Sequence, residues 1–251
     1  MKRMMTAMIA AALPAAPLFA GEAEVVTTYA DIAHATYEDA LIKAKDLQGA
    51  IDALIADPSE ATLAAAKAAW IEARVPYQQS EVFRFGNPIV DDWEGKVNAW
   101  PLDEGLIDYV SEEYEGPTDE NEYAALNIIA TPQATIAGQE VDASEITPEL
   151  IADTLNEADG IETNVARGYH AIEFLLWGQD LNGTEPGAGE RPYTDYATGD
   201  DSEHPAGADA SGGQTDHSGL RQRTHKLAKA AYYILTRKEP FRMEMMFGSY
   251  L

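Results

Sequence analysis

The chain lacks cysteine altogether, and basic residues are scarce. Without cysteine it can form no disulfide, thiolate metal site, iron–sulfur cluster or cysteine nucleophile, so any bound metal must be held by nitrogen and oxygen atoms. The 17 Lys and Arg residues face 43 Asp and Glu residues, which gives a formal net charge of −26. Such a surface repels nucleic-acid phosphates and anionic lipid headgroups and attracts cations. We therefore expect no nucleic-acid partner.

Long hydrophobic runs are also missing, except at the N-terminus. Lys2 and Arg3 precede an uncharged apolar run from Met4 to Ala16, and small residues follow around Ala20. This order is typical of a secretory signal peptide over residues 1–20, and the run is too short for a membrane span. The sequence thus predicts an exported protein of the periplasm or cell envelope, with no membrane span.

Convincing strand alternation, internal repeats, heptads and phosphate-binding glycine loops are absent too, whereas helical spacing is frequent. Apolar residues recur at helical intervals over 27–56. A second helix is expected after Asp57, as N-cap, with Pro58 in its first turn and Glu60 completing a capping box. We expect the fold class to be all-α, a helical bundle with long irregular loops.

Weaker signals predict short helices at 102–109, 122–129 and 147–155, and a longer helix from Ile161 to near Gly178. Residues 93–103 and 133–145 are expected to be loops.

Three regions divide the chain: the signal peptide, a helical domain over 21–220 and a basic tail over 221–251. Within the domain, residues 182–219 form a Gly/Asp-rich loop, in which Arg191 to Tyr196 is expected to be an ordered turn. The tail has seven Lys and Arg against two acidic residues. It is either a basic helix that docks on the acidic body or a segment foreign to the original fold, for example after a frameshift.

A histidine and a glutamate, His170 and Glu173, stand in the otherwise apolar run from Gly168 to Asp180. Positions i and i+3 share a helix face, and their burial requires a hydrogen bond, an opposite charge or a metal as partner. Imidazole and carboxylate suit iron, zinc, copper or manganese. A structural His–Glu hydrogen bond is the alternative.

A polar stripe in the second predicted helix suggests one wall of a site, although a solvated face would show the same spacing. Pro76 is expected to kink this helix. Because two ligands do not complete a metal site, Glu81 on the stripe and Asp103 are the best further candidates. The stripe contains Trp70, Arg74, Tyr77, Glu81 and Arg84.

A zinc protease of the zincin type needs a second histidine beside the first pair, but Phe174 occupies the position after Glu173. No serine sits in a nucleophile elbow either. We therefore expect a binding protein rather than an enzyme.

The chain resembles the imelysin family, in its iron-regulated protein A branch, over roughly residues 27–200. The resemblance rests on the GxHxxE motif at Gly168 and on three further blocks that keep the family's order. These blocks are residues 70–85, Trp100 to Asp103, and Gly187 to Tyr196.

This resemblance implies a periplasmic protein of two helical bundles, with the motif near their interface. It also implies a role in iron uptake, with other iron-uptake components of the envelope as partners. The C-terminal half of the family is expected to be missing. The implied cofactor is a metal ion, iron, with zinc or another divalent ion as alternatives. A metallopeptidase that uses Glu173 as ligand or base, and a non-catalytic envelope binding module, remain alternatives. The expected ligands are His170, Glu173, Glu81 and Asp103, and the expected site wall is Trp70, Arg74, Tyr77, Arg84, Trp100 and Arg191.

Overall fold

The computed structural model describes residues 21–114 and 116–197. The predicted signal peptide, the predicted basic tail and most of the Gly/Asp-rich loop lie outside these described residues. The described part is mainly helical, with one small sheet, which confirms the all-α class.

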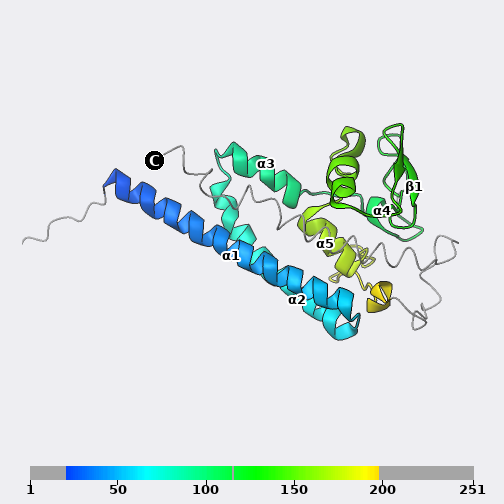
Figure 1. The fold of residues 1–251 in the computed structure, drawn as a ribbon, viewed down its shortest axis with the longest axis horizontal. Coiled ribbons are helices and arrows are strands. Elements are labelled where there is room, and N and C mark those ends of the chain that lie inside the picture. Colours follow the sequence, from blue (N-terminus) through cyan, green and yellow to red (C-terminus); the bar gives the residue numbers. More distant parts are fainter. Residues whose placement is uncertain (1–20, 115, 198–251) are drawn as a thin grey trace, which may run out of the picture.

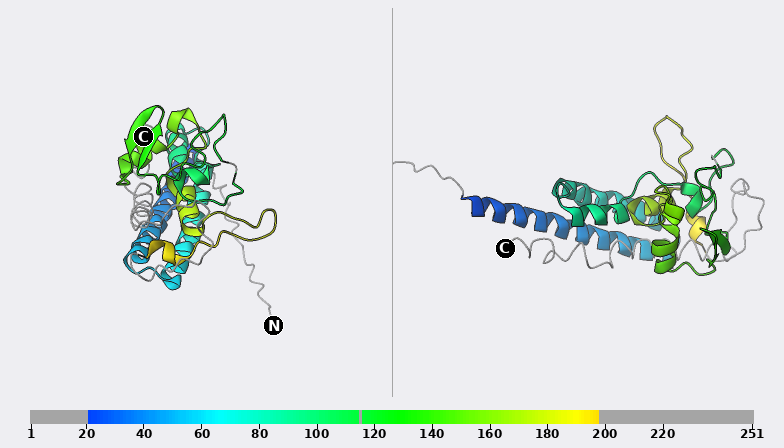
Figure 2. Two further views of the ribbon diagram at one scale, coloured as in Figure 1. Left: turned by 90° about the vertical axis from the view of Figure 1, so that its right-hand side faces the viewer. Right: turned by 90° about the horizontal axis from the view of Figure 1, so that it is seen from above.

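Two long helices form the largest unit. α1 (Glu22–Ala56) and α2 (Glu60–Gln79) lie side by side as an antiparallel pair, and the N-terminal part of α1 extends past the other elements (Figures 1 and 2). α1 buries the side chains that recur every three or four residues, as its helical period requires. They are Ala33, Tyr37, Ala40, Ala44, Leu47, Ile51 and Leu54.

The start of α2 differs from the prediction in its N-cap, which is Ser59 and not Asp57. The Ser59 hydroxyl accepts from the Thr62 amide at 3.2 Å, and the Thr62 hydroxyl lies 3.0 Å from the Ser59 amide. This reciprocal pair satisfies two backbone donors at the helix end. Thr62 thus completes the capping box, which Glu60 was expected to complete. Pro76 lies inside the helix, as the sequence indicates.

The short elements after α2 include η1 (Ser80–Phe83), α3 (Pro88–Val97), α4 (Glu104–Ile107) and α5 (Gly168–Trp177). Of these, η1 contacts both long helices, α5 contacts α2, and α3 and α4 contact α5. The first core contains Tyr77, Trp93 and Tyr169, whose rings meet at centroid distances of 5.8 and 4.9 Å. A loop was expected over residues 93–103, but the part up to Val97 is helical. It belongs to α3, which begins with Pro88 in its first turn.

A second core lies beside α4 and is built from irregular segments. Its hairpin, β1 (Gln133–Ile136) and β2 (Gln139–Asp142), stands where a loop was expected. Ala137 and Gly138 both have positive φ, the conformation that a two-residue hairpin turn needs. Ala134 and Ile136 are the buried side chains of β1. Two alternating positions are too few to identify a strand from sequence.

The remaining predictions were right only in part. The segment from 147 forms a π-helix, η2 (Leu150–Leu155), followed by η3 (Ala158–Gly160), whereas 122–129 consists of turns and irregular backbone. The helix expected from Ile161 begins only at Gly168. Asn164 holds the preceding segment in a loop by donating from its side chain to the Ala158 carbonyl at 2.9 Å. The ordered turn is confirmed as η4 (Tyr193–Tyr196).

No helix among the described residues is long and apolar enough to cross a membrane.

Candidate functional site

The motif glycine fixes where α5 begins. Gly168 has a φ of +86°, a conformation that L side chains rarely adopt, and a Cβ placed there would lie 2.4 Å from the Val97 carbonyl oxygen. The start of α5 can therefore approach the end of α3 only with glycine at this position. The two following motif residues are carried on the helix positioned by that contact.

His170 and Glu173 lie on one face of α5, as their spacing predicts. The distance from His170 Nδ1 to Glu173 Oε2 is 2.8 Å. Their side chains are 16% and 41% exposed, although the neighbouring Tyr169, Ala171 and Phe174 are buried in the core. The pair is thus a partly exposed polar contact on an otherwise apolar helix.

The Trp100 side chain adds an aromatic edge to this opening. Its ring centroid lies 5.1 Å from that of His170, and the residue is 69% exposed. A large aromatic residue left this exposed beside a polar pair is suited to contact a ligand. Trp100, which was expected in the site wall, therefore borders the His170–Glu173 pair.

Trp70 and Arg74 support α5 from α2. The Trp70 indole donates to the Tyr169 carbonyl at 2.9 Å, one residue before the motif histidine. The Arg74 guanidinium lies 5.1 to 5.6 Å from the ring centroids of Trp70, Tyr77 and Tyr169, and it donates to the Asn98 side chain. Arg74 and Tyr77 are buried. This part of the stripe is therefore an internal support and not a solvated face.

The rest of the stripe leads away from α5. Arg84 pairs with Asp91 at 3.1 Å and with Glu94 at 3.2 Å, both on α3. Glu94 accepts from Asn98, so the polar contacts run along α3 to Arg74. Glu81 is exposed at η1.

Asp103 joins two loops instead of facing the pair. Its Oδ2 accepts from the Thr163 hydroxyl at 2.6 Å and also from the Asn121 amide. In residues 21–114 and 116–197, no three His, Asp or Glu side chains are grouped so that they could hold a metal ion. The described structure thus brings together His170 and Glu173, but not Glu81 and Asp103 with them.

Sequence reasoning missed Glu104, the first residue of α4. Burial raises the pKa of its carboxyl, Arg191 lowers it, and the negative charges of Asp180 and Glu173 raise it, so that the pKa in the fold is about 7. Its amide donates to the Tyr114 hydroxyl at 3.0 Å. The only sequence signal was its place directly after Asp103. A second carboxyl group therefore lies within electrostatic range of Glu173.

Arg191 was expected in the site wall, but it forms a buried ionic centre. Its Nη1 donates to Asp108 at 2.8 Å and to Asp195 at 2.9 Å, and the Tyr109 hydroxyl donates to Asp195 at 2.7 Å. The guanidinium also lies over the Phe174 ring of α5, 5.4 Å from its centroid. This centre fastens the turn at η4 to α4 and to the underside of α5.

The donor set fits a metal ion only in part. An imidazole and a carboxylate on one helix face are suitable ligands for iron or zinc, and both are accessible. Two side chains leave other coordination positions to be filled by water, by a chelating molecule or by groups beyond the described residues.

Comparison with protein-family models gives one match, to imelysin (Peptidase_M75), over residues 33–240. The matched range begins within α1, includes the His170–Glu173 pair and extends into the basic segment. No curated protein matches the chain.

Proposed function

Since the chain belongs to the imelysin family, we propose that it is an exported protein that binds a metal ion, iron, through His170 and Glu173 in the course of iron uptake. The observation that carries the proposal is the His–Glu contact of 2.8 Å, open to solvent on a helix whose other side chains are mostly buried. Export rests on the pattern of residues 1–20.

The contact between the two side chains supports a ligand role for the histidine. A carboxylate on one ring nitrogen fixes the tautomer and orientation of an imidazole, which is the usual arrangement around metal-binding histidines. Here Glu173 contacts Nδ1 and leaves Nε2 open, and Glu173 would ligate the same ion by exchanging this hydrogen bond for the metal. The bound ion would supply a positive charge beside Glu173 and Glu104.

The surroundings also favour a cation. The carboxylates of Asp180 and Glu173 both lie within electrostatic range of Glu104 and raise its pKa. The whole chain carries a formal charge of −26. Carboxylates gathered in this way raise the local concentration of cations and speed their capture.

Metal titration of the purified protein by calorimetry tests the proposal. His170→Ala and Glu173→Ala should each weaken the binding of ferrous iron at least tenfold, roughly the loss of one ligand or its orienting partner. The chain offers a matched control in His34 and Glu38, an exposed pair on α1 whose atoms lie 3.9 Å apart. His34→Ala should leave the affinity unchanged. Equal binding by the wild type and both motif variants would refute the proposal.

A second measurement locates the ion. Iron bound at His170 should quench the fluorescence of Trp100, whose ring lies 5.1 Å from the imidazole. Trp100→Phe should reduce this quenching. Quenching that is as large in the variant as in the wild type would place the ion elsewhere.

A metallopeptidase is the second candidate, because the matching family model carries a peptidase label. Phe174, the residue after the motif glutamate, is 3% exposed and packs in the core, so the second histidine of a zincin is replaced by an apolar side chain. Cleavage of a protein substrate that chelators stop and that Glu173→Gln abolishes would favour this candidate over simple binding.

A further inference from the structure

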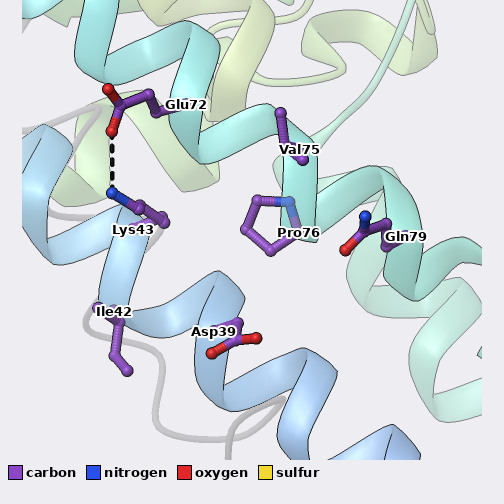
Figure 3. A pocket seen from close by; sticks show the side chains of 7 residues that line it. All are labelled: Asp39, Ile42, Lys43, Glu72, Val75, Pro76 and Gln79. Carbon is purple, nitrogen blue, oxygen red and sulfur yellow. Dashed lines mark hydrogen bonds and ion pairs between the residues drawn. The ribbon is translucent and has the colours of Figure 1, made fainter.

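A groove lies along the α1–α2 pair, between side chains of both helices. Figure 3 shows its lining, which comes entirely from these two helices and encloses about 490 Å³. The lining residues are Asp39, Ile42, Lys43, Glu72, Val75, Pro76 and Gln79.

The groove combines apolar surface with two carboxylates, Asp39 and Glu72, and one lysine. Ile42 is 49% exposed and Val75 is 53% exposed, whereas Lys43 is paired with Glu72 at 2.8 Å. Pro76 has no amide hydrogen, so the Glu72 carbonyl lacks the donor that residue 76 normally supplies within a helix. A helix with an apolar stripe and basic flanks matches this surface, because such helices dock into apolar grooves between helices.

The chain itself contains such a segment at residues 220–240. Leu220, Leu227, Ala231 and Ile234 recur at the spacing of one helix face. Within residues 220–240 six basic residues accompany a single acidic residue, Glu239. The basic residues are Arg221, Arg223, Lys226, Lys229, Arg237 and Lys238.

Two further observations connect this segment with the helix pair. The imelysin match extends to residue 240, so the segment belongs to the part of the chain that resembles the family. The described residues end at Ala197, and the intervening 22 residues, 198–219, span up to about 70 Å when extended. This reach exceeds the length of α1, about 50 Å for 35 residues.

We propose that residues 220–240 form an amphipathic basic helix that packs into the α1–α2 groove of the same chain. Its apolar stripe covers Ile42 and Val75, and its basic residues face the carboxylates of Asp39 and Glu72. The proposal is independent of metal binding, because the groove and the His170–Glu173 pair share no residue.

Engineered cysteines test the contact without background, since the chain has none of its own. Ile42→Cys or Val75→Cys is combined in the full-length protein with a cysteine at Leu227, Ala231 or Ile234. A disulfide requires Cα atoms within about 7 Å, so at least one of these six pairs should close within a monomer on mild oxidation. Ile89→Cys, at a position 50% exposed on α3, is the control partner and should not cross-link.

Monomers cross-linked through Ile42 or Val75 but not through Ile89 support the proposal. Disulfide-linked dimers would mean that a second copy occupies the groove, and a complete lack of cross-linking, or equal cross-linking through Ile89, would overturn it.

A stability measurement provides an independent readout. Val75→Asp should lower the melting temperature by roughly 4 °C or more, because the covered position would bury a charge. Ile89→Asp, at a similarly exposed residue outside the groove, should change it little. Equal effects of the two substitutions would show that nothing covers Val75.

Discussion

Two polar centres adjoin α5, and they differ in how they meet solvent. In the first, Arg191 lies between Asp108 and Asp195, and the three side chains are 0%, 0% and 4% exposed. In the second, His170 and Glu173 contact each other, the Trp100 ring lies beside His170, and the two side chains are 16% and 41% exposed. Both lie on segments that the imelysin match covers.

This difference in exposure separates a centre that stabilises the fold from one that can bind a ligand. A buried cation between two carboxylates is neutralised, and changing one partner leaves an uncompensated charge in the core. A partly exposed pair keeps part of its hydration, so its members can exchange their mutual hydrogen bond for another partner at a smaller cost than a buried pair. The buried centre therefore holds α5 and its following turn in place, and the open pair is left to bind.

The largest expected effect comes from breaking the buried centre. Arg191→Met should destabilise the fold by about 3–5 kcal/mol, because Asp108 and Asp195 would remain buried with like charges and no cation. Urea denaturation followed by circular dichroism measures this loss. Adding Asp108→Asn and Asp195→Asn should restore part of the stability. If Arg191→Met unfolds like the wild type, the centre is not a support.

Gly168→Ala should rank second. The new Cβ would lie 2.4 Å from the Val97 carbonyl oxygen, and φ is +86°, so backbone strain and overpacking together cost about 3 kcal/mol. Gly95→Ala is the matched control, since nothing lies within 4 Å of its Cβ position inside α3. Alanine there should be neutral or stabilising by up to about 1 kcal/mol. Equal denaturation midpoints for the two variants would contradict the close approach of α3 and α5.

Much of the first core was predictable, because its elements repeat at helical intervals over many turns. The period of α1 and the Pro76 position in α2 could be read directly. The second core could not, since its hairpin turn depends on positive φ at Ala137 and its loops on side-chain hydrogen bonds such as that of Asn164. Contacts of this kind leave no periodic signal in a sequence.

The site shows the same division. The His170–Glu173 contact follows from helix geometry, and its position on one face was predicted correctly. Whether Asp103 joins the pair depends on Asn121 and Thr163, which are distant in sequence and engage its carboxylate. Glu104 was missed because its raised pKa arises from burial, which spacing does not reveal.

A smaller, pH-dependent effect is expected at Glu104, between the two centres. Its pKa is raised from 4.5 to about 7 in the fold, so the folded state favours the protonated form. Stability should therefore fall as the pH rises from about 4.5 to about 7 and then level off. In chelator-treated protein, Glu104→Gln should remove this decline and raise the melting temperature at pH 8 by roughly 4 °C. Parallel pH profiles for the wild type and the variant would contradict the shift.

The smallest effect on stability should come from the open pair itself. His170→Ala and Glu173→Gln each remove one exposed hydrogen bond, which is worth less than about 1 kcal/mol at this exposure. Urea denaturation of metal-free protein should thus scarcely distinguish them from the wild type, even though iron affinity falls at least tenfold. The ratio of the two effects is the informative quantity. If either variant destabilises the metal-free fold as much as Arg191→Met does, the pair is a second support, and the distinction between the two centres fails. If stability is unchanged and affinity is lost, the exposed fraction of the pair marks the place where the protein meets its ligand.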